Sequence, residues 1–181
     1  MKTTGIVRRI DDLGRLVIPK ELRKTLRIKE GDPLEIYASE DVLMLKKYSP
    51  VVTISSYAQI IADGIQTITE KPCLITDGDT VIYASGNNYK DIIGKNLTNE
   101  MEQVLRDRKS IILNKSDGAK IIAVAENSQI DAENQIIVPM VAGGDCFGSI
   151  VLFDKDKSSR FSSVDVKLLQ LGSSFLTAQF S

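Results

Sequence analysis

The first thirty residues of the chain are rich in cationic side chains. They contain nine Lys/Arg and four Asp/Glu, a net charge of +5, whereas residues 51–181 have twelve against sixteen, a net charge of −4. The planar guanidinium of arginine suits phosphates and guanine edges, and lysine acts as a point charge. This asymmetry indicates an anionic partner for the N-terminal segment and a different task for the acidic remainder. The nine cations are Lys2, Arg8, Arg9, Arg15, Lys20, Arg23, Lys24, Arg27 and Lys29.

Aromatic side chains are absent from residues 1–30, which bears on the kind of anion they would bind. Proteins that bind single-stranded nucleic acid use aromatic platforms on which the bases stack, so duplex DNA is the better candidate. The alternative interpretation is that the charges only solvate a small surface. On the electrostatic pattern alone, both interpretations stay open.

Histidine is absent from the whole chain. Its absence removes the usual general base and the commonest metal ligand, so Ser-His-Asp and Cys-His catalysis are excluded. The two cysteines, Cys73 and Cys146, have no CxxC partner and are expected to be buried free thiols. Carboxylate or lysine chemistry stays possible, but the sequence has no paired-carboxylate motif. We therefore expect no enzyme, no cofactor and no metal site.

The cations before residue 19 are positioned by short extended elements. The β-branched residues of segment 4–10 predict a strand that carries Arg8. Residues 11–14 predict a turn in which Gly14 adopts a positive φ, and Arg15 follows that turn directly. Residues 16–18 predict a second short strand.

A short helix is expected to position the next two cations. Pro19 suits the first position of a helix, which then continues through residues 20–26. Its two leucines are four residues apart and share one face, so Arg23 and Lys24 lie on the other face.

Apolar and polar residues alternate over residues 34–38, which predicts a half-buried strand. The mainly apolar segment 42–47 is expected to pair with it as a β-hairpin that completes the N-terminal unit. A unit of about 47 residues buries too little apolar area to be stable alone, and this one has no disulfide or metal to help. We therefore predict that it is an obligate dimer.

Residues 48–53, with Pro50, predict a linker to an α+β domain of about 130 residues. Its helices are expected at residues 54–69, 97–108 and from about 162 to the C-terminus. Its strands are expected at residues 74–77, 80–84, 110–113, 119–125, 135–141 and 146–153.

The first and last helices of this domain have apolar residues at a 4, 3, 4, 3 spacing. The helix at residues 54–69 has Ile54, Ala58, Ile61, Ile65 and Ile68, and the last helix has Val164, Leu168, Leu171, Phe175 and Ala178. This spacing fits a helix-pairing seam between subunits. It fits equally well two helices that pack on their own sheet. At the start of the last helix, Ser162 and Asp165 predict a capping box inside a Phe161/Val166 hydrophobic staple.

The segment TGIVRRIDDLGRLVIPKELRKTLRIKEGDPLEI closely resembles the N-terminal DNA-binding domain of the AbrB family of bacterial transition-state regulators, over residues 1–47 and without a gap. The resemblance implies a swapped-hairpin β-barrel, an intertwined dimer formed by residues 1–50 of two chains. It also implies DNA contacts at Arg8, Arg15, Arg23 and Lys24, with Arg9 as a weaker candidate. Position 24 is Arg in the family, and the Lys found here keeps the charge without the bidentate geometry.

The segment NQIIVPMVAGGDCFGSIVLFDKD resembles the closing hairpin of GAF domains, which implies a GAF-like fold for residues 54–181. GAF domains often bind a small molecule, so this domain is either a sensor of an unknown effector or an oligomerisation module that joins two dimers into a homotetramer. In the segment YASGNNYKDIIG, the side chains of Ser85, Asn87, Asn88 and Tyr89 either line a ligand pocket or form a polar loop that caps the next helix. Gly143-Gly144 is expected to be a tight turn rather than a phosphate cradle.

Together with the charge pattern, the resemblance to the AbrB family implies a sequence-specific regulator that binds duplex DNA and controls sporulation or post-exponential genes. The runner-up is an antitoxin-like autorepressor with similar swapped hairpins and a C-terminal domain that binds a protein partner. The chain has no long apolar run and its N-terminus has no apolar signal core, so we expect no membrane partner and a cytoplasmic location.

Overall fold

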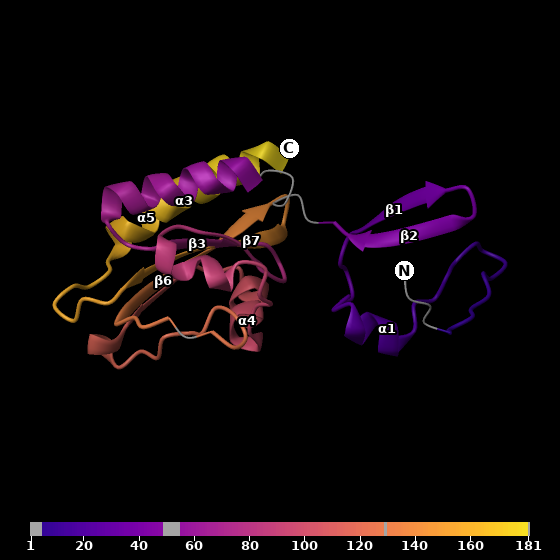
Figure 1. The fold of residues 1–181 in the computed structure, drawn as a ribbon, viewed down its shortest axis with the longest axis horizontal. Helices are drawn as coiled ribbons and strands as arrows, with labels where there is room; N and C mark the ends of the chain where they lie inside the picture. The colour runs from indigo at the N-terminus through magenta and orange to yellow at the C-terminus, as the bar shows by residue number, and fades with distance from the viewer. Residues whose placement is uncertain (1–4, 49–54, 129, 181) are drawn as a thin grey trace. The chain divides into compact units, whose positions relative to one another are not determined.

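The computed structural model describes residues 5–48, 55–128 and 130–180. The chain divides into two compact units, Met1–Tyr48 and Ser49–Ser181 (Figure 1). We call the described residues of the first unit, 5–48, the head, and those of the second unit the body. Apart from Tyr48, the predicted linker at residues 48–53 lies outside the described residues.

The head contains one short helix and one hairpin. Helix α1 spans Lys20–Thr25, and Pro19 is its N-cap with φ −56°. Strands β1 (Leu34–Ser39) and β2 (Val42–Lys47) pair in antiparallel register. The predicted helix and hairpin are therefore confirmed to within one residue or so at each end, the usual uncertainty of helix and strand boundaries.

The strands predicted at residues 4–10 and 16–18 are wrong for the single chain. Residues 5–10 and 15–19 form no strand, and residues 1–4 lie outside the described part. A β-strand exists only when a neighbouring strand completes its hydrogen bonds, and β1 and β2 already pair with each other. The β-branched composition correctly predicts extended backbone, but residues 7–10 and 16–18 join neither of the sheets formed by the described strands.

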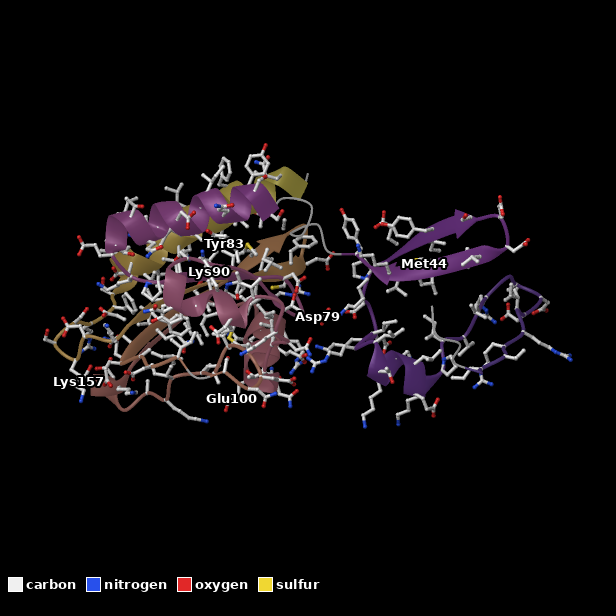
Figure 2. All side chains as sticks on the ribbon, viewed as in Figure 1. Met44, Asp79, Tyr83, Lys90, Glu100 and Lys157 are labelled. Atoms are coloured by element: carbon white, nitrogen blue, oxygen red, sulfur yellow. The ribbon has the colours of Figure 1, made fainter. Side chains whose placement is uncertain are left out.

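The head has no hydrophobic core of its own. None of its Ala, Val, Leu, Ile, Met or aromatic side chains is buried. Val7 is 86% exposed, Val17 is 72% exposed, and Met44, labelled in Figure 2, is 46% exposed. A folded domain that leaves this much apolar surface in water is incomplete, because burial of such surface is the main driving force of folding.

The body is a five-stranded antiparallel sheet with helices on both faces. The strand order is β4-β3-β7-β6-β5. The strands are β3 (Cys73–Thr76), β4 (Val81–Ala84), β5 (Ile111–Asn114), β6 (Asn134–Ala142) and β7 (Asp145–Asp154), and the helices are α3 (Ser55–Thr69), α4 (Asn99–Asp107) and α5 (Ser163–Thr177), with short 3-10 helices at Asn87–Ile92, Lys115–Asp117 and Ala178–Phe180. Helices α3 and α5 lie together along one face of the sheet, and α4 lies on the other (Figure 1).

Each face of the sheet has its own apolar core. On the α3/α5 face, Ile75, Ile150 and Leu152 of the sheet pack with buried residues of both helices. On the α4 face, Leu74 and Val151 pack with Met101 and its neighbours. Alternate residues of β3 and β7 thus point to opposite cores, as the two-residue period of a strand requires.

Two local signals in the body are confirmed. Gly143 (φ 59°) and Gly144 (φ 90°) form the two-residue loop between the paired ends of β6 and β7, where both positions need a positive φ. At the start of α5, the Ser162 hydroxyl accepts a bond from the Val164 N–H and the Asp165 carboxylate accepts one from the Ser162 N–H, which completes the capping box. Both signals depend only on residues close in sequence.

The strand predicted at residues 119–125 is wrong. Only an isolated bridge between Leu97 and Ala125 forms there. The buried side-chain amide of Gln135 takes the place of a neighbouring strand, because it accepts a bond from the Ile122 N–H (2.8 Å) and donates one to the Ile122 carbonyl (3.0 Å). One side chain therefore satisfies the backbone that a ladder would otherwise have paired.

The two apolar helix stripes differ in what they cover. Ala58 and Ile65 of α3 are buried on the sheet and Ile61 packs beside them, whereas Ile68 at the end of the stripe is 71% exposed; Ile54 lies outside the described residues. In the stripe of α5, Leu168 packs against the same core and Phe175 contacts Tyr57 of α3, whereas Val164 is 71% exposed and Leu171 is 70% exposed. The packing interpretation therefore holds for most of the α3 stripe, and the α5 stripe is only partly covered by the described residues.

Candidate nucleic-acid interface

The turn before Arg15 is held in shape by backbone hydrogen bonds. The Gly14 N–H donates to the Asp11 carbonyl (3.0 Å), and the Asp11 N–H donates to the Arg15 carbonyl (3.1 Å). Gly14 has φ 77°, a conformation that costs other residues about 1 kcal/mol or more. The predicted turn at residues 11–14 is therefore confirmed, and it places Arg15 at a fixed distance from Asp11.

The Asp11 carboxylate binds both the backbone and the side chain that follow it. Its Oδ1 accepts bonds from the N–H groups of Leu13 (3.0 Å) and Arg15 (2.7 Å), and its Oδ2 accepts one from Arg15 Nε (2.7 Å). The bond from the Arg15 N–H, followed by the bond from its side chain, lowers the pKa of the Asp11 carboxyl below its usual value. The carboxylate is thus ionised at neutral pH.

Asp11 was missed among the candidate site residues. The signal was present in the sequence, because Asp at the first position and Gly at the fourth are typical of a type I turn. Asp11 and Gly14 have this spacing. A count of cations identifies the arginines but does not identify the carboxylate that orients one of them.

Arg23 and Lys24 are neighbours on α1 and both are exposed. Neither forms an ion pair within the described residues. The chain after α1 is tied to β2, since Lys47 Nζ lies 3.2 Å from the Arg27 carbonyl and 3.0 Å from Asp32 Oδ2. The two cations thus stand on a helix whose end is anchored to the hairpin.

Arg8 and Arg9 lie in the exposed extended segment before the turn. The structure places Arg23 beside Lys24, and Arg15 beside Asp11, within local elements. Of the four candidate cations, Arg15 alone forms an ion pair within the described residues, and its partner is Asp11. No ion pair among the described residues therefore ties these cations into one common surface.

The segment considered as a ligand pocket is used for packing instead. Ser85 is buried, and its hydroxyl accepts a bond from the Cys73 N–H (2.7 Å) and donates one to the Cys73 carbonyl (3.0 Å). Tyr89 packs on the α4-side core, and Asn88 is exposed in the 3-10 helix at Asn87–Ile92. The side chain of Asn87 lies outside the description. Ser85 and Tyr89 are therefore structural.

A depression of about 550 Å³ lies elsewhere on the body, between two irregular segments. It is lined by Lys115, Ile121, Ile122, Ala123, Ile130, Asp131 and Ala132. None of the residues proposed for ligand binding from the sequence lines it. Tyr83 of β4, labelled in Figure 2, contributes to the fold, because its hydroxyl donates to the Asp63 carboxylate of α3 at 3.0 Å.

Metal clusters and membrane-spanning helices are both absent from the part of the chain that the structure describes. No cluster of three or more Cys, Asp or Glu residues in this part of the chain is arranged to hold a metal ion. No helix among the described ranges has the length and apolar character needed to cross a membrane.

Comparisons with known proteins define the class of each unit. Residues 53–181 match the family model described as "Stage V sporulation protein T C-terminal, transcription factor", and residues 7–53 match the model described as "Antidote-toxin recognition MazE, bacterial antitoxin". The GAF-B domain of DevS from Mycobacterium smegmatis has a similar fold, with a TM-score of 0.55 at 12% identity over 69% of this chain and 90% of that chain. The body is therefore a GAF-like domain, and the chain is of the class of two-domain bacterial transcription factors.

Full-length similarity identifies the family. The chain is 41% identical to stage V sporulation protein T of Bacillus subtilis (strain 168) over 180 residues, which cover 99% of this chain and 98% of the relative. It is 43% identical over 88 residues to the transition state regulatory protein AbrB of the same organism, covering 49% of this chain and 92% of the relative. The chain belongs to the stage V sporulation protein T family of AbrB-like transcription regulators. The sequence-based assignment to AbrB-like regulators is confirmed.

Proposed function

We propose that two heads fold together into one swapped-hairpin barrel that binds duplex DNA sequence-specifically, and that the chain thereby regulates sporulation or post-exponential genes in the cytoplasm. One observation carries the proposal: the head of a single chain buries none of its Ala, Val, Leu, Ile, Met or aromatic side chains. A second, identical head offers an apolar surface of the same size, so each head can cover the other. No different protein is needed to complete the fold.

The hairpin of the head has a face suited to this partner. The register of β1 and β2 puts Leu34, Ile36, Ala38, Leu43 and Leu45 on one face, because paired residues share a face and alternate residues point the same way. Ile36 is 63% exposed in the single chain, and burying such a side chain contributes about 1.5–3 kcal/mol. The extended segments 5–10 and 16–18, which form no strand in the single chain, would pair with the same segments of the second chain.

Dimerisation also supports DNA contact by Arg8, Arg15, Arg23 and Lys24. All four are exposed, and a two-fold axis would place eight such cations on one assembly. We assign Arg8, Arg15 and Arg23 to guanine edges or phosphates, which arginine contacts in a bidentate manner. We assign Lys24 to a phosphate, because a lysine ammonium has no bidentate geometry.

The salt dependence of DNA affinity tests this proposal. If the dimer neutralises about eight phosphates, log K will fall against log[salt] with a slope of about −7. Fluorescence anisotropy of a labelled duplex, titrated with the full chain between about 50 and 200 mM salt, gives the slope. A slope near zero would contradict the assignment of these cations to phosphates.

For the body we propose a tetramerisation interface on the outward face of α5. Val164, Leu171 and Phe175 are exposed there, and the ring of Phe175 lies 6.1 Å from that of Tyr57 on α3, so the two helices form one apolar face. Two DNA-binding dimers joined in this way gain avidity without a new DNA contact. An effector that acts on this domain is the second candidate, and thermal-shift screening of nucleotides and amino acids tests it.

Substitution of Leu171 by glutamate will halve the mass of the full chain in solution, because two charges would be brought into the proposed interface. Light scattering across a concentration series measures this change. Gln170→Glu is the matched control, since it adds the same charge to the adjacent exposed position of α5. An unchanged mass for the Leu171 variant would exclude this face as the interface.

The antitoxin alternative has support in the match of residues 7–53 to an antitoxin family model. It predicts that a toxin protein co-purifies with the chain. The body instead matches a transcription-factor family model over residues 53–181, which favours the regulator.

A further inference from the structure

We propose that Asp11 is a positioning residue for base readout: it grips Arg15 by Nε and thereby presents the two terminal nitrogens of the guanidinium to a guanine. This inference rests on the proposed function and goes further, because it names one arginine as the reader of sequence and names the residue that aims it. According to this proposal, sequence-specific binding requires the Asp11 carboxylate, although both the carboxylate and DNA are negatively charged.

The arrangement of hydrogen bonds leaves the correct donors free. A guanidinium has five N–H donors, and Asp11 Oδ2 takes the single one on Nε at 2.7 Å. The donors on Nη1 and Nη2 remain, and this edge is the one that fits guanine O6 and N7. Although the Arg15 side chain is 69% exposed, its direction is therefore set before DNA arrives.

The same carboxylate also fixes the backbone that carries Arg15. Oδ1 accepts the N–H groups of Leu13 and Arg15, so one carboxylate connects the turn, the Arg15 backbone and the Arg15 guanidinium. The side chain and the turn therefore move as one unit. A preorganised side chain loses less rotamer freedom on binding than a free one, which strengthens a geometry-dependent contact more than a purely electrostatic one.

The other proposed DNA contacts have no such support. Arg8, Arg23 and Lys24 form no ion pair within the described chain, so their side chains can reach any phosphate that lies nearby. Phosphate contacts set affinity, and base contacts set specificity. The structure thus separates a sequence-reading residue from residues that bind the backbone of DNA.

Asp12 provides a control in the adjacent position. It is exposed, and its side chain makes no hydrogen bond or ion pair within the described residues. Loss of either carboxylate removes one negative charge from the same turn, so long-range electrostatics predicts the same tighter binding for both. Only a positioning role of Asp11 predicts that loss of the Asp11 carboxylate weakens binding to the selected duplex while loss of the Asp12 carboxylate strengthens it.

The experiment compares the full-length wild type with Asp11→Asn and Asp12→Asn. A duplex is selected from random DNA by the wild type, and affinities are measured for it and for a scrambled duplex of the same composition. For Asp12→Asn we expect tighter binding to both duplexes and a ratio within about twofold of wild type. For Asp11→Asn we expect the affinity for the selected duplex to fall and the ratio to drop by about tenfold or more.

A modified base distinguishes positioning from a general loss of fit. Each guanine of the selected duplex is replaced in turn by 7-deazaguanine, which lacks the N7 acceptor. Wild type and Asp12→Asn should lose affinity at one guanine in each half-site, whereas Arg15→Ala and Asp11→Asn should be insensitive there. The two substitutions should be non-additive, because they remove the same interaction.

The outcomes separate this inference from the proposed function. If wild type does not discriminate between the two duplexes, the proposed function fails. If wild type discriminates and Asp11→Asn keeps both the ratio and the 7-deazaguanine effect, positioning by Asp11 is overturned. Asparagine retains an oxygen for the Leu13 and Arg15 N–H groups, so the turn should persist. If thermal unfolding shows that the turn is lost in Asp11→Asn, the variant Asp11→Ser is used in its place, because serine also suits the first position of this turn. The same criteria then apply to Asp11→Ser.

Discussion

Replacing Ile36 by aspartate will abolish DNA binding by the full chain, with an expected loss of affinity of about 100-fold or more. Ile36 lies on the apolar face of the hairpin, opposite Leu45, and is 63% exposed in a single chain. In a core shared by two heads this position becomes buried. A carboxylate buried without a partner costs several kcal/mol, and the two-fold symmetry introduces it twice.

Ser39→Asp is the matched control for this substitution. It adds the same charge at the end of the same strand, but alternation puts Ser39 on the opposite face from Ile36. DNA affinity of this control should stay within about threefold of wild type, since surface substitutions change stability little. Electrophoretic mobility shift and light scattering measure binding and mass together. Normal DNA binding by the Ile36 variant would show that the apolar face of the hairpin is not part of a shared core.

Replacing Gly148 by alanine will destabilise the body by roughly 3 kcal/mol or more. Gly148 lies in β7 with φ 145°, a conformation that side chains rarely adopt. A Cβ placed there would lie 2.0 Å from the Thr76 carbonyl oxygen and 2.8 Å from the Asp77 Cα, both of which are backbone atoms. Because β3 and β7 are central strands of the sheet, relief of this clash requires them to separate.

Gly78→Ala is the control for the Gly148 substitution. Gly78 has no atom within 4 Å of an added Cβ, so its replacement should change the free energy of unfolding by no more than about 0.5 kcal/mol. Urea unfolding followed by circular dichroism gives both values. Equal stability of the two variants would contradict the close approach of β7 to the backbone of β3.

Elements that depend on neighbours in sequence were predictable. The hairpin β1–β2 follows from alternation, the Gly143-Gly144 turn from the need for positive φ at both positions, and the start of α5 from its Ser162/Asp165 capping box. In each case the hydrogen bonds or side-chain contacts that decide the structure lie within a few residues. Their signals are therefore complete within a short window of sequence.

Elements that depend on distant partners were not predictable from local pattern. Residues 119–125 have the composition of a strand, but the amide of Gln135 satisfies the backbone of Ile122 in place of a strand. Ser85 lies in a polar segment that fits either a ligand pocket or a capping loop, yet its hydroxyl bonds to the backbone of Cys73 on the adjacent strand. Neither partner is visible from the spacing of nearby residues.

The cations of the candidate site were predictable from the sequence, but the contact that orients one of them was not. Composition located the cations in the first thirty residues, because an excess of Lys and Arg is readable without a fold. The pairing of Asp11 with Arg15 depends on which way a turn directs two side chains, and composition does not carry that information. The direction of the Arg15 side chain is set by its contact with Asp11, and this contact forms only in the folded turn.

The most direct test of a core shared between two heads is an intermolecular NMR measurement on the full chain. One half of the sample carries 13C-labelled methyl groups in a deuterated background, and the other half is unlabelled and protonated. We predict intermolecular nuclear Overhauser effects at the methyl groups of Val7, Val17, Ile36 and Leu43. A folded head whose methyl groups show only intramolecular effects would contradict the shared core, and with it the assembly proposed to present eight cations to DNA.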